Sequence, residues 1–336
     1  MGYSNNYKDI PDNIKKRLTI ANVFYTPDYE KNVLLRGQSV LFIWDDAFIL
    51  ATRIRERSFF KVAILDTEPF AYYDGYDEKS FIDNAMQILK DNGVKWTFTN
   101  TTARLQSYPH HSAVVPSGDY IIDLTLSEDE LWKNVHTKHR NSIRRGEKDG
   151  LELLIGGEDL LSEYVPLSNE TYERSNVSDG GYDYYKGLIT GLSNNSLIML
   201  VKNQDGVQSG GMFYYNQSMA YYVHGASIRR PSPGATNYLL WKAVMYFKEK
   251  GVEKFSFVGY HYYPEEGSKL DGIQRFKERF GGPLAPCFNF RYVQNKYVYR
   301  LYCIIMQLKS NHKFLKYQDS IDKQIAQHHY TELNQD

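Results

Sequence analysis

The first third of the chain alternates apolar, β-rich runs with one amphipathic helix. In chain order the pattern predicts a hairpin at 39–46 and 47–56, strand-rich sequence at 59–73, a helix at 78–92 and a strand at 94–101. Asp45 and Asp46 mark the hairpin turn, and Gly93 ends the helix. This alternation predicts an α/β unit.

Proline and glycine punctuate residues 107–120, and we interpret this stretch as the crossing into a second unit. The length of 336 residues favours two domains over one. We therefore divide the chain into an N-terminal domain at 1–118, a C-terminal domain at 119–310 and a polar, partly frayed tail at 311–336.

The second unit begins with a strand and then a helix with a strong start signal. Ser127 and Glu130 form a capping box, and an apolar seam predicts a helix that runs to Asp149. The second half of this helix is basic. Arg140 and Arg144 lie four residues apart on one face, where they would clamp a phosphate or an RNA backbone. A solvated basic face is the alternative.

Two tight turns between three β-rich runs predict an antiparallel meander. Its strands are expected at 196–203, 207–216 and 219–227. Gly210 and Gly211 inside the middle strand indicate a bulge or the close approach of a ligand. Four tyrosines alternate across the strand faces, Tyr214 and Tyr222 against Tyr215 and Tyr221. One of these pairs is expected to line a cleft and the other to pack.

After the meander, residues 229–235 (RRPSPGA) lead into a buried helix. A glycine turn before a helix N-terminus can hold an anionic group on free N–H donors, which makes Arg229 and Gly234 candidate phosphate contacts. An ordinary helix start bounded by proline explains the same residues. A strand at 254–260 then leads through a polar loop to residue 272, and a strand followed by a helix is expected beyond residue 287.

The segment 272–282, GIQRFKERFGG, combines an apolar stripe with a lysine. Ile273, Phe276 and Phe280 fall on one face of a helix, and the glycine pair that follows suits its end. Lys277 lies beside this stripe, where its methylenes cover apolar neighbours while its ammonium reaches a cleft and stabilises an oxyanion. A solvated lysine on an amphipathic helix is the alternative.

Composition narrows the possible partners. Forty basic and forty acidic residues cancel, so no overall field favours DNA or an anionic membrane, and RNA or phosphate binding requires a local patch. Cys287 and Cys303 lack metal or disulfide spacing, and no apolar run is long enough to span a membrane, which together predict a cytoplasmic protein. His110 and His111 have no third ligand nearby, so we expect no metal site.

Three pieces in order resemble the Fem family of peptidoglycan aminoacyltransferases and its FemAB-like relatives in the GNAT acyltransferase superfamily. They are the basic helix LWKNVHTKHRNSIRRGEKDGLEL, the meander with the segment PGATNYLLWKAVMYFKEKGVEKFSFVG, and GIQRFKERFGG. The resemblance covers mainly residues 119–293. It implies an α/β fold of the α+β type, with two tandem GNAT-like domains, each a mixed, largely antiparallel sheet flanked by helices.

The resemblance also implies an activity. Fem enzymes transfer an aminoacyl group from a charged tRNA to the amine of a peptidoglycan precursor, so we expect an N-acyltransferase acting on a small-molecule or lipid-linked amine of the cell envelope. Lys277 and Phe276 match the Phe-Lys pair whose lysine stabilises the oxyanion, and no tightly bound cofactor is required. Gly272 matches the glycine of the same motif.

A base must also take the proton of the acceptor amine. The candidate bases on the segment before Lys277 are Tyr260, His261, Glu265, Glu266 and Asp271, with Tyr260 as the first candidate. Tyr222 is the candidate substrate contact on the meander.

Two departures from the family leave the donor open. The chain has no heptad hairpin for the coiled-coil arm of some members, and 229–235 matches the CoA pyrophosphate loop only in part. The donor is therefore aminoacyl-tRNA or acyl-CoA. The alternatives are a CoA-dependent N-acetyltransferase of an amino sugar and a GNAT-fold binding module without catalysis.

Overall fold

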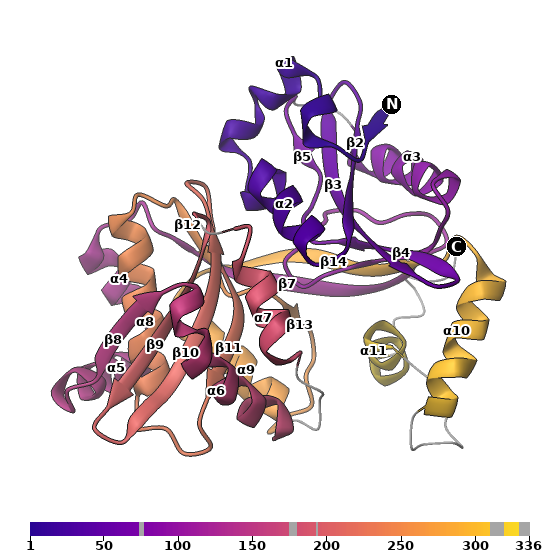
Figure 1. The fold of residues 1–336 in the computed structure, drawn as a ribbon. Helices are drawn as coiled ribbons and strands as arrows, with labels where there is room; N and C mark the ends of the chain where they lie inside the picture. The colour runs from indigo at the N-terminus through magenta and orange to yellow at the C-terminus, as the bar shows by residue number, and fades with distance from the viewer. Residues whose placement is uncertain (74–76, 175–179, 193, 310–318, 329–336) are drawn as a thin grey trace.

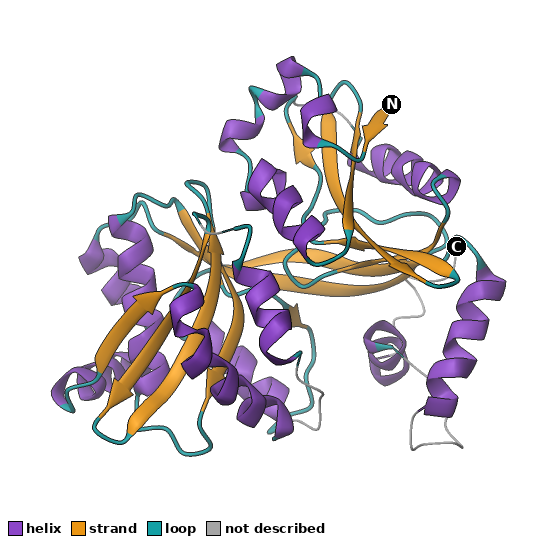
Figure 2. Cartoon of the chain, in the orientation of Figure 1, coloured by secondary structure: helices purple, strands orange, loops and turns teal. Residues whose placement is uncertain are grey.

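The computed structural model describes residues 1–73, 77–174, 180–192, 194–309 and 319–328. In this part of the chain the strands form one continuous sheet (Figures 1 and 2). Its order is β1 (Gly2–Ser4), β2 (Ser39–Trp44), β3 (Phe48–Arg57), β4 (Phe60–Leu65), β6 (Val94–Thr99), β14 (Leu284–Tyr292), β7 (Ala113–Asp123), β12 (Lys254–Ser256), β11 (Ala220–Ser227), β10 (Gly206–Tyr215), β9 (Ser196–Asn203) and β8 (Glu152–Gly156). Two short strands lie beside this path, β5 (Phe70–Ala71) on β3 and β13 (Tyr260–His261) on β7.

Helices flank the sheet on both faces (Figure 2). In the described ranges they are α1 (Asp12–Lys15), α2 (Pro27–Leu35), α3 (Glu78–Asp91), α4 (Glu128–Asn134), α5 (Thr137–Lys148), α6 (Leu161–Glu173), α7 (Gly181–Ile189), α8 (Ala235–Glu249), α9 (Lys269–Glu278), α10 (Lys296–Lys309) and α11 (Ser320–His328). Within these ranges, no helix has the length and apolar character needed to cross a bilayer. The mixed α/β architecture with a largely antiparallel sheet confirms the predicted fold class.

The sequence pattern located most of these elements correctly. The hairpin at Asp45 and Asp46 is β2 paired with β3, and the meander is β9, β10 and β11. Gly93 follows α3 with φ of 85°, as a helix-ending glycine does.

The sheet is continuous because two strands cross between its halves (Figure 1). β7 pairs with β14 along most of its length, and its other end pairs with β12. Residues 113–123 form one strand of 11 residues through Pro116 and Gly118, so the expected crossing is only partly a loop. β14 comes from the C-terminal part of the chain, yet it lies between β6 and β7. The division at residue 118 stays a prediction.

One hydrophobic core cluster joins the two halves of the molecule. It combines side chains from the segment 10–51 with side chains from the segment 160–226. Phe24 packs edge-on against Tyr221 with ring centroids 5.3 Å apart, and the Asn32 side chain donates to three backbone carbonyls at 187–190. The halves therefore share apolar and polar contacts.

The helix expected from Ser127 to Asp149 is broken in two. The capping box of Ser127 and Glu130 is present at the start of α4, but Val135 is extended and ends that helix. The His136 side chain then accepts from the Lys138 N–H and caps α5. The backbone N–H of His136 donates to the Arg279 carbonyl at 2.9 Å, so a tertiary contact fixes the break.

The helix that carries Lys277 also differs from its prediction. α9 begins at Lys269, and Ile273 is 40% exposed, while the buried residue of this helix is Gln274 at 4% exposure. Phe280 is buried just beyond the helix end, and Gly281 follows with φ of 85°, as predicted. The apolar stripe is therefore shorter than expected, because Ile273 faces outward.

The expected pairing of the tyrosines is wrong. Tyr214 lies opposite Tyr221 and both belong to the core shared by the two halves, whereas Tyr215 and Tyr222 pack on the α8 side. Cross-strand partners of an antiparallel pair share a face, which decides the grouping. Within the C-terminal tail, α11 is a helix with Ile321 buried, while 311–318 and 329–336 lie outside the described residues.

Candidate active site

Lys277 is held by two backbone carbonyls. Its Nζ donates to the carbonyl of Val258 and, at 2.7 Å, to that of Gly259. Burial lowers the pKa of this ammonium to about 8, against the opposing effect of the nearby Asp119 carboxylate. An ammonium has three N–H donors, so two fix its position and the third is available to a ligand.

The two carbonyls come from strained backbone. Val258 has φ of 46° and Gly259 has φ of 56°, and the first is unfavourable for a β-branched residue. The Val258 N–H donates to Ser256 Oγ and the Gly259 N–H donates to the Thr101 carbonyl, which together hold this turn. Such strain clusters at functional sites, where the surrounding structure maintains it.

Asp119 is the carboxylate of the site. It lies on β7, is 2% exposed, and accepts a hydrogen bond of 2.5 Å from Ser256 Oγ. Its other oxygen has no partner among the described residues. Burial raises the pKa of Asp119 to about 6, although Ser256, Arg104 and Lys277 oppose that shift. A carboxyl group with this pKa can exchange protons near neutral pH.

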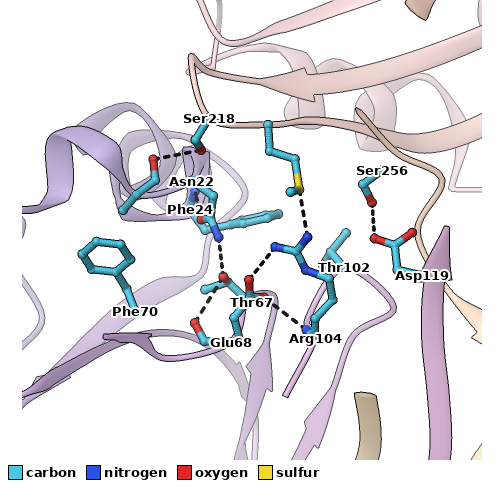
Figure 3. A network of polar contacts seen from close by, with 12 residues as sticks. Asn22, Phe24, Thr67, Glu68, Phe70, Thr102, Arg104, Asp119, Ser218 and Ser256 are labelled. Atoms are coloured by element: carbon cyan, nitrogen blue, oxygen red, sulfur yellow. Dashed lines mark hydrogen bonds and ion pairs between the residues drawn. The ribbon is translucent and has the colours of Figure 1, made fainter. Parts of the chain in front are cut away.

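Ser256 links the two charged groups. Its hydroxyl donates to Asp119 and accepts from the N–H of Val258, whose carbonyl holds Lys277. Figure 3 shows Asp119 and Ser256 beside a second polar network. In that network Arg104 pairs with Glu68 at 2.5 Å and donates to the sulfur of Met219, so residues from both halves meet next to the site.

The catalytic candidates beside Lys277 are placed by packing. Phe276 lies 4.9 Å from the buried His139 ring, and its carbonyl bonds to His139 Nε2 at 2.9 Å. Burial lowers the pKa of His139 to about 4. Tyr260 lies on β13 and packs edge-on against Tyr120, and its carbonyl accepts from Ser117 Oγ. Packing therefore fixes Phe276 on α9, next to Lys277, and Tyr260 on β13, directly after Gly259.

The two arginines that were expected to contact a phosphate interact with other protein groups in the structure. Arg140 donates to the carbonyls of Trp132 and Lys133, and the Arg144 guanidinium lies 5.2 Å from the Trp132 ring. Arg140 also donates to the Thr137 hydroxyl of α5, so these contacts of the two arginines go to α4 and α5 rather than to α9.

The loop before α8 is also engaged. The Arg229 N–H donates to Glu170 at 2.5 Å. Gly234 caps α8 with φ of 85°, and a Cβ there would lie 2.2 Å from the Ser142 carbonyl oxygen of α5. This glycine permits close packing of α5 against the loop.

Tyr222 and Gly272 have different surroundings. The Tyr222 ring stacks on Phe213 at 5.3 Å, and it lies over Gly211 and Gly225, where added Cβ atoms would collide with it. The absence of a Cβ at Gly210 and Gly211 leaves room for neighbouring side chains. The pairing register of β10 shifts on either side of these glycines, against β9 before them and against β11 after them. A Cβ added at Gly272 would meet nothing within 4 Å.

The acidic candidates of the polar loop lie away from the lysine network. Glu265 and Glu266 are exposed, and Asp271 pairs with Arg275 at 2.5 Å. Burial lowers the pKa of His261, which lies on β13. The sequence analysis missed Asp119, although a single carboxylate inside the apolar run VVPSGDYII was a usable signal. The described residues contain no group of three His, Cys, Asp or Glu positioned for a metal ion.

Residues 61–205 match the model of the FemAB family. This segment is therefore similar to the FemAB family. Its fold is similar to the crystal structure of FemX, with 13% identity, a TM-score of 0.67 and coverage of 90% of this chain and 99% of that chain. No curated protein matches the sequence.

Two further solved structures share this FemAB-like fold. One is the C-terminal domain of a putative lysylphosphatidylglycerol synthetase from Agrobacterium fabrum, with 14% identity, a TM-score of 0.56 and coverage of 88% of this chain and 94% of that one. The other is L-PGS from Bacillus licheniformis, with 12% identity, a TM-score of 0.55 and coverage of 91% and 98%. At these identities the similarity concerns the fold.

Proposed function

We propose that this FemAB-like protein transfers an aminoacyl group to an amine of a cell-envelope precursor related to peptidoglycan or polysaccharide. The observation that carries the proposal is the buried Lys277 ammonium, which two carbonyls hold beside the Asp119 carboxylate. The family match and the similarity to FemX support the same chemistry.

The two groups divide the reaction between them. The acceptor amine attacks the acyl carbonyl carbon and forms the C–N bond, and the third N–H of Lys277 stabilises the resulting oxyanion. Asp119 accepts the proton that the amine loses. The intermediate then collapses, the bond from the acyl carbon to the donor oxygen breaks, and Asp119 returns the proton to that oxygen. No step requires a bound cofactor.

Aminoacyl-tRNA is the donor that we favour over acyl-CoA. In CoA-dependent enzymes of this type, the turn before the helix equivalent to α8 approaches the pyrophosphate. Here α5 lies against that turn at Gly234, and the Arg229 N–H is bound to Glu170. Binding of charged tRNA, CoA and acetyl-CoA, measured side by side by calorimetry, separates the donors. Saturable CoA binding would contradict this choice.

Lys277→Met tests the chemistry. We expect transfer from charged tRNA to a precursor with a free amine to fall by about 10²–10³-fold, the usual loss for one oxyanion donor, while donor affinity is kept. Lys269→Met, at the exposed start of the same helix, is the matched control and should retain transfer. Equal transfer by both variants would refute the role of Lys277. A wild-type protein that binds precursor without transfer would instead identify a binding module.

A further inference from the structure

A cavity of about 740 Å³ lies between the C-terminal helices and the sheet. The strands β3, β4, β6 and β14 form its floor, and α10 and α11 cover it. Figure 1 shows these two helices beside β4 and β14, away from α5 and α8. Its volume lies within the range of about 300–1,000 Å³ typical of small-molecule sites.

Five aromatic side chains form one part of the wall. They are Phe60, Trp96, Phe98, Tyr299 and Tyr302. The Trp96 ring lies 4.7 Å from Phe60 and 4.8 Å from Tyr302, so the aromatic surface is continuous. The aliphatic chains of Ile305 and Met306 extend this wall from α10. Such a surface can remove an apolar chain from water.

Two arginines add positive charge to the lining of this cavity. Arg55 and Arg57 line it from the same face of β3, since they are two residues apart on a strand. Among the described residues neither has a carboxylate within ion-pair distance, whereas Arg291 on the same wall is paired with Asp319 and Asp322. Partial burial and neighbouring cations lower the pKa of Arg55. A partly buried cation without a counterion is costly, so an anionic ligand group would relieve it.

Two apolar side chains of the cavity lining are also exposed to solvent. Phe59, at the tip of the β3–β4 hairpin, is 90% exposed, and Ile305 is also exposed. The outer face of α10 continues this surface with Tyr297, Leu301, Ile304 and Leu308. Exposed apolar surface of this kind marks a site of contact with a lipid or a partner. Thr101 and His261 also line the cavity, and the Thr101 carbonyl accepts from the Gly259 N–H in the turn that holds Lys277.

We infer that this cavity binds an amphiphile with a long apolar chain and a phosphate, the chain on the aromatic wall and the phosphate on Arg55 and Arg57. Two arginines on one strand face can share the several oxygens of a phosphate. The site is a ligand site in its own right and does not depend on the transfer reaction.

Trp96 provides a direct measurement of binding. It is buried at the cavity wall, so a bromine atom on a bound chain should quench its fluorescence, and we would titrate the protein with 12-bromododecyl phosphate below its micellar concentration. We expect saturable quenching that is absent in Trp96→Phe. Absence of quenching in the wild type, or equal quenching in Trp96→Phe, would overturn the inference.

Variants test the two parts of the site separately. Arg55→Gln should weaken binding of the phosphate about tenfold to a hundredfold, as expected for a charged hydrogen bond, and leave the weak binding of bromododecanol unchanged. Met306→Glu should abolish binding through the apolar wall. The control Arg300→Gln, on the exposed face of α10, should bind as the wild type does. Equal affinity of Arg55→Gln and wild type would refute the phosphate contact.

Two further arms identify the source of the ligand and keep the two proposals apart. Quenching by vesicles that contain brominated phosphatidylglycerol would support the site with a bilayer lipid as its ligand, and quenching by the soluble compound alone would support it with a free amphiphile. Lys277→Met should bind the amphiphile normally even though transfer is lost. Failure of transfer with intact quenching therefore rejects the proposed function alone, and the reverse result rejects this site alone.

Discussion

At the scale of single residues, the backbone at Val258 and Gly259 positions the Lys277 ammonium. Both residues have positive φ, and both carbonyls point at the Lys277 ammonium. The local sequence SFVGYH supplies one support of this turn, because the Val258 N–H donates to Ser256 Oγ. The other support is remote in sequence, since the Gly259 N–H donates to the Thr101 carbonyl, and the sequence does not predict it. The lysine itself was predictable from its motif, whereas its partners were not.

Gly259→Ala should destabilise the protein. A Cβ at this position would lie 2.9 Å from the Thr101 side chain, and positive φ is unfavourable for alanine, so we expect a loss of about 1–3 kcal/mol in the free energy of unfolding. Gly272→Ala is the control. It has open space around it within α9 and should gain about 0.5–1 kcal/mol. Urea titrations measure both, and an unchanged stability of Gly259→Ala would contradict the strained turn.

Asp119→Asn should change the pH dependence of stability. Because the folded-state pKa of about 6 lies above the ordinary value of 3.8, the folded wild type binds this proton more tightly than the unfolded chain, and its stability falls as pH rises from 4 to 6. Asparagine cannot ionise, so the stability of the variant relative to wild type should rise by about 2–3 kcal/mol across this window. A difference that is constant between pH 4 and 7 would show that Asp119 titrates normally.

At the scale of elements, the periodicity located most strands and helices, but it did not predict the helix break that a tertiary contact fixes. The capping box at Ser127 was readable, and so was the meander with its two turns. The break between α4 and α5 was not, because it depends on the contact between His136 and Arg279, which is remote in sequence. Asp119 was overlooked for a similar reason. Its partner Ser256 comes from β12, and only the folded sheet brings the two together.

His139 couples α5 to the helix that carries Lys277. Its ring packs between Phe276 and Phe280 and bonds to a carbonyl of α9, so His139→Leu should lose about 1–3 kcal/mol of stability at pH 7. The folded-state pKa of about 4 lies below the ordinary 6.5, so the wild type loses stability as pH falls from 6.5 to 4. The advantage of wild type over the variant should therefore shrink at pH 4, which thermal melts at both pH values would check. An advantage that grows at pH 4 would contradict the neutral, buried imidazole.

At the scale of the whole molecule, the two halves form one cooperative structure. β14 from the C-terminal part completes the first half of the sheet, and one apolar core contains side chains from both halves. The sequence predicted two adjacent α/β units but gave no signal for this exchange, because strand order is decided by pairings between distant segments. The polar contacts between Arg104, Glu68 and Met219 add to the junction.

A single unfolding transition follows from this shared core. We expect scanning calorimetry of the full chain to show one peak whose calorimetric enthalpy equals the van't Hoff enthalpy. Arg104→Met should shift that peak to lower temperature without splitting it, because the largely buried Glu68 loses the guanidinium and keeps only the backbone N–H of residue 104. Two separate peaks in the wild type would show that the halves unfold independently.

The central claim is that Asp119 and Lys277 act together in aminoacyl transfer. The most direct test is the pH profile of kcat/KM for wild type and Asp119→Asn. Because the base must be deprotonated and the ammonium protonated, the wild-type profile should be a bell with limbs near pH 6 and pH 8. Asp119→Asn should be much slower and should lose the acidic limb. An acidic limb that persists unchanged in Asp119→Asn, at wild-type rate, would contradict the account.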